Sequence, residues 1–434
     1  MRTPIFDFLS SYGGSSVTRF HMPGHKGHPR LGIESLDITE IKGADVLYSA
    51  DGIIAESREN ARALFGTGAT YYSTEGSTLA IKAMLATALR ERTAGSSRTI
   101  LAARNVHRAF INATALLDLD VEWIYPKREG HLVACDISAD DVVSAIGAMK
   151  VRPFAVYITS PDYLGNMQDV KGIAEALSRY DIPLLVDNAH GAYLAFLDED
   201  SHPISLGAAM CADSAHKTLP VLTGGAYLHV SKRCSHYIES ASDMLSLFAS
   251  TSPSYLTLAS LDLCNAYIDD GYKEKLRITV AMLDAIKEKY SLRRDIDPLK
   301  LVIDRPIADE LREYGIECEF SDDEYTVLMI TPDNTDEELS LLDRALCELL
   351  SVENRVEHKP QAFLRAERAM SIRDAVLSKH ESVPVGKSVG RVLSTATVSC
   401  PPAVPIAVSG EVITEAHVSL FERYGIDRVE VVKN

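Results

Sequence analysis

A chain of 434 residues is too long for a single compact core, so we expect a large domain with smaller ones attached. With 46% hydrophobic and 24% charged residues the chain is not disordered, and no apolar run reaches the roughly 18 residues of a transmembrane helix. The formal charge of −17 argues against a nucleic-acid partner and suits a small cationic substrate.

The seven cysteines are scattered and form no CxxC pair or metal-ligand spacing, which indicates a reducing compartment. Near the N-terminus, Asp7 and the polar residues after it interrupt the apolar run that a signal peptide requires. We therefore expect a cytoplasmic protein.

From about residue 66 to residue 230, short apolar runs alternate with amphipathic stretches of helical length. This alternation is typical of an α/β fold in which helices cover a mostly parallel sheet. The expected strands are Thr99–Ala103, Val121–Tyr125, Phe154–Thr159, Leu184–Asp187 and Gly225–Val230, and the expected helices include Ser77–Arg90, Ala139–Met149 and Val170–Arg179. Ser138 is the expected N-cap of the second of these helices, with two aspartates in its first turn.

The rest of the chain divides into further segments. A long helical stretch follows Tyr255, and from about Leu292 the pattern reads strand, helix, strand, helix. The stretch after Arg355 begins polar and carries a proline-rich segment, which indicates another unit. The expected organisation is an N-terminal arm (1–50), a large domain that carries the site (51–285), a small α/β domain (286–355) and a C-terminal domain (356–434).

A polar cluster with one lysine, DSAHKTL, lies between two apolar runs. Sites in open α/β sheets collect beyond the carboxyl ends of the strands, and this cluster can occupy such a place. Lys217 is the candidate to form an imine with the aldehyde of pyridoxal 5′-phosphate (PLP), as the lysine of a PLP enzyme does. Taken alone, a lysine beside a histidine is more often a solvated loop residue.

Upstream, the apolar run Leu184–Asp187 ends in a carboxylate. A carboxylate held against the pyridine nitrogen of PLP raises the pKa of that nitrogen and keeps it protonated. The charged ring can then accept the electrons released at the α-carbon of a substrate. Asp187 is the candidate for this role, and the alternative is that it only caps a turn after the strand.

The phosphate of PLP needs its own site, and the TEGST segment supplies one at the start of an expected helix. Backbone N–H groups and the helix dipole favour a dianion there, and Ser77 and Thr78 add hydroxyl donors next to Gly76. Ser214 and His216 can add to this cradle from the lysine cluster. The alternative for the TEGST segment is an ordinary N-cap.

His107 follows the strand Thr99–Ala103 and can lay its imidazole flat on the pyridine ring. Ala189 is small, lies two residues after Asp187, and can cover the opposite face. We include His190, the next residue, among the cofactor-binding candidates. A lone loop histidine is more often structural.

The segments FHMPGHKG, EGST, RNVHRAF, VDNAHGA, SAHKTL and STSPSYL together resemble the ornithine/lysine/arginine decarboxylases, PLP-dependent enzymes of fold type I. The resemblance covers most of the chain and is to the compact branch without an N-terminal wing domain. It implies decarboxylation of lysine, ornithine or arginine, with release of CO2 and a precursor of polyamine biosynthesis.

The resemblance also implies the roles already assigned above to Lys217, Asp187, His107 and the phosphate residues. It further implies a homodimer with its active sites at the interface, in which Thr251 and Ser252 reach the phosphate of the neighbouring subunit. The distal cation of the substrate needs a carboxylate, for which Asp45, Asp51 and Glu56 are candidates.

Three segments depart from the family pattern, and they bear on the choice of substrate rather than on cofactor binding. They are Cys400–Ala403, Ser409–Glu411 and the Asp162 position of a proline-aspartate-tyrosine loop.

We expect no metal, because Pro23 and Gly24 prevent His21 and His25 from forming a helical i, i+4 ligand pair. Three rival interpretations stay open. The first is another PLP reaction at the α-carbon, namely transamination, β-elimination or aldol cleavage, and the second is a PLP-binding protein without turnover. A nucleotide-binding α/β protein is a third, although no glycine-rich phosphate motif follows an expected strand.

Overall fold

The computed structural model describes residues 1–93, 96–127, 130–351, 363–398 and 403–433. The chain forms two compact units, each built from three separate segments. Unit 1 comprises residues 1–91, 185–283 and 330–335, and unit 2 comprises residues 92–184, 284–329 and 336–434. The domain boundaries expected near residues 50, 285 and 355 stay predictions.

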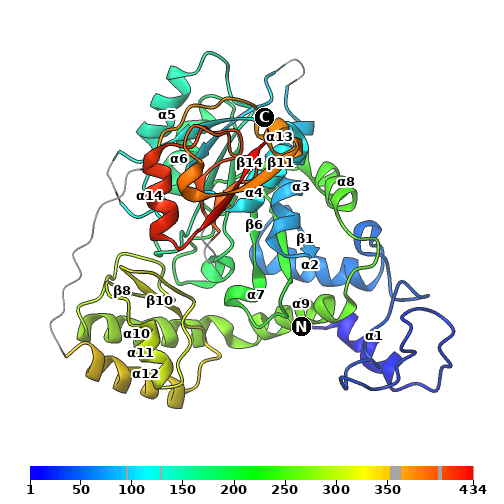
Figure 1. Ribbon diagram of the computed structural model, residues 1–434. Helices are drawn as coiled ribbons and strands as arrows, with labels where there is room; N and C mark the ends of the chain where they lie inside the picture. The colour runs from blue at the N-terminus through cyan, green and yellow to red at the C-terminus, as the bar shows by residue number, and fades with distance from the viewer. Residues whose placement is uncertain (94–95, 128–129, 352–362, 399–402, 434) are drawn as a thin grey trace. The chain divides into compact units, whose positions relative to one another are not determined.

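The main sheet has seven strands in the order β1-β7-β6-β5-β4-β2-β3. Figure 1 labels two of them, β1 and β6. Its strands are β1 (Ala69–Ser73), β2 (Thr99–Ala103), β3 (Asp120–Ile124), β4 (Ala155–Thr159), β5 (Leu184–Asp187), β6 (Met210–Asp213) and β7 (Ala226–Val230). β7 runs antiparallel to both of its neighbours, while β5 pairs in parallel with β6, and β2 in parallel with β3 and β4. The predicted α/β fold with a mostly parallel sheet is confirmed.

The predicted strands agree with the structure to within one residue at each end. β1 (ATYYS) and β6 (MCAD) were not among the predicted strands, because neither contains the Val, Ile or Leu residues that mark each of the strands that were predicted. The omission matters for β6, since this strand ends directly before the lysine cluster.

The longer helices of unit 1 are α1 (Pro4–Gly13), α2 (Ile53–Phe65), α3 (Gly76–Arg90), α8 (Tyr237–Phe248) and α9 (Tyr255–Tyr267), with the short helix α7 (Ala215–Thr218) between β6 and β7. A π turn at Ile268–Tyr272 joins α9 to α10 (Lys273–Lys289). Short 3-10 turns occupy Leu47–Ser49, Ala192–Phe196, Lys232–Cys234 and Val385–Lys387. The face of α3 that carries Leu79, Met84 and Leu85 is buried, and α3 packs on β6, β7 and α8.

Unit 2 contains the helices α4 (Arg108–Leu117), α5 (Ala139–Ala148), α6 (Val170–Ser178), α11 (Ala308–Glu313), α12 (Asp336–Leu349), α13 (Ile372–Leu377) and α14 (Glu415–Arg423). Ser138 caps α5 as predicted and forms a capping box with Asp141. The small sheet has the order β8 (Lys300–Ile303), β10 (Thr326–Met329), β9 (Phe320–Ser321). The segment from Leu292 therefore follows the predicted strand and helix order, with one additional short strand.

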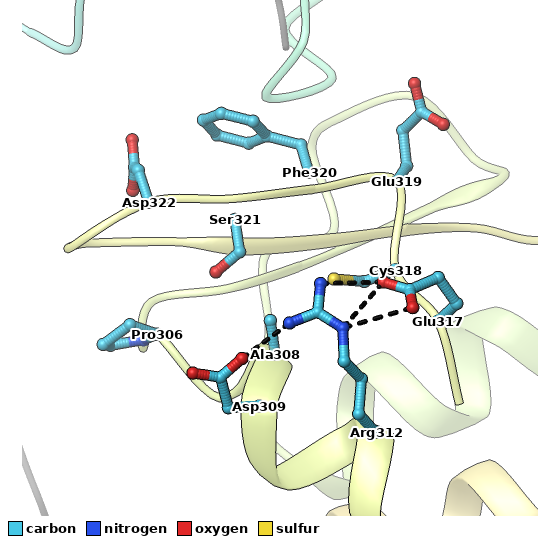
Figure 2. A pocket seen from close by; sticks show the side chains of 10 residues that line it. All are labelled: Pro306, Ala308, Asp309, Arg312, Glu317, Cys318, Glu319, Phe320, Ser321 and Asp322. Carbon is cyan, nitrogen blue, oxygen red and sulfur yellow. Dashed lines mark hydrogen bonds and ion pairs between the residues drawn. The ribbon is translucent and has the colours of Figure 1, made fainter. Parts of the chain in front are cut away.

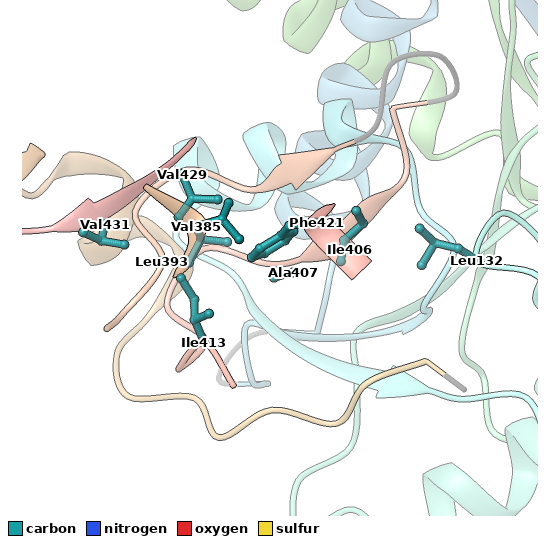
Figure 3. Packing of buried hydrophobic residues seen from close by; sticks show 9 residues of the cluster. All are labelled: Leu132, Val385, Leu393, Ile406, Ala407, Ile413, Phe421, Val429 and Val431. Atoms are coloured by element: carbon teal, nitrogen blue, oxygen red, sulfur yellow. The ribbon is translucent and has the colours of Figure 1, made fainter. Parts of the chain in front are cut away.

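The C-terminal part of unit 2 holds two strand pairs, β11 (His380–Pro384) with β14 (Arg428–Val432) and β12 (Thr397–Val398) with β13 (Pro405–Ala407). Figure 3 shows its apolar core, in which Phe421 of α14 packs among aliphatic side chains from these segments and from Leu132. No helix in the described part of the chain is long and apolar enough to cross a membrane.

Candidate active site

Lys217 lies in α7, which begins directly after β6. Its Nζ atom is 2.8 Å from Nε2 of His190, a buried residue in the turn that follows β5. The two segments meet because β5 and β6 are parallel neighbours in which Asp187 lies opposite Ala212. The carboxyl ends of adjacent parallel strands share one edge of a sheet, so this edge carries the lysine.

Asp187 is the last residue of β5 and is only 2% exposed. Its Oδ1 atom accepts a hydrogen bond of 3.2 Å from the backbone N–H of Ala189. A carboxylate this deeply buried requires hydrogen-bonding or cationic partners, and a protonated pyridine nitrogen is one such partner. The structure thus brings Asp187 and Lys217 to the same edge of the sheet.

The predicted phosphate residues come together at the N-terminus of α3. The hydroxyl of Ser214 donates to Oγ of Ser77 at 2.8 Å, although 137 residues separate them. Gly76 opens α3 at φ +70°, and a Cβ built on it has no heavy atom within 4 Å, so open space lies above the turn. The N-cap Glu75 makes no side-chain capping bond, which leaves this end of the helix to an anion.

The turn before α3, residues 74–76, is the proposed place of the phosphate and is called the phosphate turn below. Gly224 and Gly225 connect this turn to the lysine cluster. The backbone N–H and Nδ1 of His216 approach the carbonyl oxygen of Gly225 at 3.2 and 3.0 Å. The N–H of Gly76 donates to the carbonyl of Gly224 at 2.7 Å. Gly224 adopts φ +96°, and a Cβ there would lie 3.0 Å from the carbonyl oxygen of Thr74, so this position requires glycine.

This set of groups fits PLP. It offers an amine, a buried carboxylate and a cradle of hydroxyl and N–H donors with open space above Gly76. Thr78 lies in the first turn of α3 beside the cradle and is partly exposed.

His107 is the N-cap of α4, where its Nδ1 accepts from the N–H of Ala109 at 3.0 Å. This hydrogen bond orients the imidazole through a partner within the protein. His107 belongs to unit 2 and Lys217 to unit 1, and the stacking of His107 on the ring stays a prediction.

Thr251 and Ser252 lie exposed between α8 and α9. The preceding residue, Ser250, donates its backbone N–H to Oε1 of Glu75 at 2.8 Å. This bond ties the loop to the N-terminal turn of α3 in the same chain. The part that Thr251 and Ser252 play at the phosphate of a neighbouring subunit stays a prediction.

The acids considered for the distal cation are largely engaged elsewhere. Asp45 adopts φ +68°, and its carboxylate accepts N–H bonds from Val46, Gly52 and Ile54 at 2.7–2.9 Å. Burial opposes ionisation of Asp45, but these N–H groups outweigh it and lower its pKa. Glu56 pairs with Arg2 at 3.0 Å, which leaves the exposed Asp51.

The two histidines of the N-terminal arm have different partners. His25 Nε2 lies 3.1 Å from Asp37, whereas His21 Nε2 lies 2.6 Å from the hydroxyl of Tyr12. Their imidazoles are therefore engaged separately in hydrogen bonds.

Two of the departures from the family pattern are structural within unit 2. Asp162 is 1% exposed and accepts both the backbone N–H and the side-chain amide of Asn166, at 2.9 and 2.7 Å. Ser409, the departing residue of its segment, is 1% exposed, and the nearby Glu411 is buried, accepts the N–H of Val408 at 2.7 Å and lies 3.7 Å from Arg104. Of the third segment, Cys400–Pro402 lies outside the described residues.

A hollow of about 460 Å³ opens beside α11 and β9 in unit 2, and none of the predicted site residues lines it (Figure 2). Its charged groups largely pair with one another, because Arg312 bonds Asp309 at 2.6 Å and Glu317 at 2.8 Å. This pairing leaves the guanidinium occupied.

Asp213 is the first residue of the DSAHKTL cluster, and the sequence predicted no role for it. The structure buries Asp213 completely, with His202 and His229 around its carboxylate. The available signal was its place at the end of an apolar run, directly before Ser214.

The fold and the site together define a PLP-dependent α/β enzyme. A family model described as "Orn/Lys/Arg decarboxylase, major domain" matches residues 3–310, and the chain belongs to this family. It is 29% identical to an arginine decarboxylase of Halalkalibacterium halodurans over 96% of this chain and 92% of that protein. It is 21% identical to the lysine decarboxylase LdcA of Pseudomonas aeruginosa over 70% of this chain and 44% of that protein.

Among solved structures, the lysine decarboxylase LdcF of Francisella novicida superposes with a TM-score of 0.82 at 16% identity, over 99% of this chain and 81% of that one. This likeness confirms the fold. The comparisons also confirm the predicted family and the decarboxylase activity toward a basic amino acid, and with the family the PLP cofactor.

Proposed function

We propose that this enzyme is an arginine decarboxylase, which converts arginine and one proton into agmatine and CO2. The observation that carries the proposal is the nearly full-length match to a protein named arginine decarboxylase. The match to a protein named lysine decarboxylase covers less than half of that relative. The net charge of −17 favours a cationic substrate as well.

We further propose that Lys217 holds the cofactor through its amine and that Asp187 binds the ring nitrogen. Bound PLP supplies an electron sink for the pair of electrons left on the α-carbon when CO2 departs. The phosphate would lie on Gly76, Ser77, Thr78, Ser214 and His216, with His107 and Ala189 on the two faces of the ring. The hydrogen bond between Ser77 and Ser214 supports this cradle.

His190 is proposed to orient the Lys217 amine. An ammonium group only donates hydrogen bonds, so Nε2 of His190 is the acceptor whenever Lys217 is protonated. An amine held in this way can deliver its proton to the α-carbon in place of the lost carboxylate. That step replaces the broken C–C bond with a C–H bond and completes the balance of the reaction.

The proposed assembly is a homodimer in the cytoplasm. The N-terminal arm exposes Phe20 (93%), Leu31 (84%) and Met22 (66%), which a second copy would cover. Three side chains this exposed within one short segment agree with its burial against a second copy. The six cysteines in the described part of the chain are free, which supports a reducing compartment.

The test is mass spectrometry of the products after PLP-loaded protein is incubated separately with arginine, lysine and ornithine. We expect agmatine from arginine and a much slower reaction with the other two. Faster formation of cadaverine or putrescine would overturn the choice of substrate. A keto acid in place of an amine would instead indicate transamination.

A further inference from the structure

A buried polar cluster surrounds Asp213 at the carboxyl end of β6. Nε2 of His202 lies 2.9 Å from its Oδ2 atom, and Nε2 of His229 lies 3.3 Å from the same oxygen. The side-chain amide of Asn188 donates to Oδ1 at 2.9 Å, and the thiol of Cys211 lies 3.5 Å from Oδ1. All five side chains are buried and belong to unit 1.

Asn188 connects this cluster to the proposed cofactor site. It follows Asp187 directly, and its backbone N–H donates to the carbonyl of Ala212 at 3.0 Å. Asn188 therefore donates hydrogen bonds to two consecutive residues of β6. Its backbone N–H bonds Ala212, and its side-chain amide bonds Asp213. On its other side Asp213 precedes Ser214, which bonds Ser77 next to the phosphate turn.

We propose that Asp213, held by His202, is a positioning residue that fixes Asn188 and thereby the carboxylate of Asp187 against the ring nitrogen of PLP. The proposal rests on the proposed role of Asp187. A rigid support matters here because a small displacement of a group in contact with the reacting system costs much of its effect.

The charges in the cluster agree with this role. Burial opposes ionisation of Asp213, but His202 and His229 outweigh it and hold its pKa well below the ordinary value. Burial in turn lowers the pKa of His229 against the attraction of Asp213. His229 Nδ1 lies 2.9 Å from the hydroxyl of Thr70, which extends the network to β1.

A metal ion is the alternative occupant, since His202, Cys211 and Asp213 each offer a ligand atom within 4.8 Å of the others. The tautomer of His202 argues against it. Nδ1 of His202 accepts the backbone N–H of Ile204 at 3.4 Å, so Nε2 carries the proton that it donates to Asp213. A protonated nitrogen cannot coordinate a metal.

The test is a double-mutant cycle with Asp213→Asn and Asp187→Asn, and with Asp198→Asn as an exposed control. The readouts are kcat, the dissociation constant of PLP, and the pH at which the visible absorbance of the Lys217-linked cofactor titrates. When Asp213→Asn is introduced into the otherwise unchanged protein, we expect kcat to fall about 10-fold and the pH of the cofactor titration to shift. In the Asp187→Asn background we expect a change of less than about twofold.

Additive effects in the two backgrounds would overturn the proposal, because they would mean that Asp213 does not act through Asp187. One equivalent of tightly bound metal per chain in the purified holoenzyme would also overturn it. If Asp187→Asn alone leaves the titration unchanged, the assignment of Asp187 fails first, and this proposal fails with it. His202→Leu removes a donor to Asp213 and replaces Asp213→Asn in the same cycle should Asp213→Asn not fold.

Discussion

The amine of Lys217 lies 2.8 Å from Nε2 of His190, and the two side chains follow the ends of neighbouring parallel strands. Sheet topology thus brings the lysine and the histidine together, and this contact is the one that we propose orients the amine. These two levels of control can be separated by mutation.

Lys217→Ala should abolish the visible absorbance of the lysine-linked cofactor and lower kcat about 10³-fold or more. The reason is that the variant loses the amine that holds the cofactor and carries the proton. Lys232→Ala removes an exposed lysine of the same unit and is the matched control. If Lys217→Ala keeps the absorbance, another lysine holds the cofactor.

His190→Leu should leave the cofactor attached to Lys217 but lower kcat about 10- to 100-fold, because the amine loses the acceptor that orients it. His190→Gln retains a side-chain oxygen as acceptor, so its kcat should fall less than that of His190→Leu. Steady-state kinetics and absorbance spectra of both variants check this. Equal losses in the two variants would show that hydrogen bonding to Nε2 is not what matters at this position.

Asp187 and Ser77 could be predicted as site candidates because Asp187 ends a predicted strand and Ser77 starts a predicted helix. Lys217 and Ser214 became candidates through their polar cluster between two apolar runs, since the strand before them, β6, was not predicted. The network around Asp213 could not be read in this way. His202 precedes β6 and His229 lies within β7, and only the folded sheet brings them to one carboxylate.

Asp45, one of the three candidates for the distal cation, has partners that the sequence did not indicate. It adopts a left-handed backbone, and its carboxylate accepts N–H groups at the start of α2. Local sequence does not report which acids are used as caps, because Asp is equally acceptable in a cap and on a solvated surface.

Asp162 should make unit 2 less stable as the pH rises. Burial raises its pKa to about 6, against the opposing effects of the Asn166 bonds and Lys300. The folded state binds this proton more tightly than the unfolded state does. The contribution of Asp162 to the free energy of unfolding is therefore highest below about pH 4 and is lost as the pH rises through about 6. The shift corresponds to roughly 2–3 kcal/mol at most.

Denaturant unfolding of the parent and of Asp162→Asn at pH 4.5 to 7.5 measures the effect, with the pH range chosen as about the window of this titration. Other buried carboxyl groups, such as Asp262 with a pKa of about 6, also titrate there, so the informative quantity is the difference between the two proteins. We expect the variant to lose part of the parent's decline with pH. Parallel curves would mean that Asp162 is already ionised throughout.

Arg104 should be a main stabilising residue of unit 2. It is 1% exposed, and its guanidinium donates to the carbonyls of Pro405 and Ile406 at 2.9 and 3.3 Å while lying 3.7 Å from Glu411. Arg104→Met keeps the side-chain volume but leaves the two carbonyl acceptors and the buried Glu411 carboxylate without their donor. We therefore expect the free energy of unfolding to fall by about 3–5 kcal/mol.

Adding Glu411→Gln to Arg104→Met removes the unpaired negative charge of Glu411 and should restore about 1–2 kcal/mol of the lost stability. Arg152→Met, at an exposed arginine of the same unit, should change stability by less than about 0.5 kcal/mol. Urea unfolding of the four proteins gives the comparison. If Arg104→Met and Arg152→Met unfold at the same urea concentration, the guanidinium contributes no more in its buried site than at the surface, and the charge compensation inferred for Glu411 is wrong.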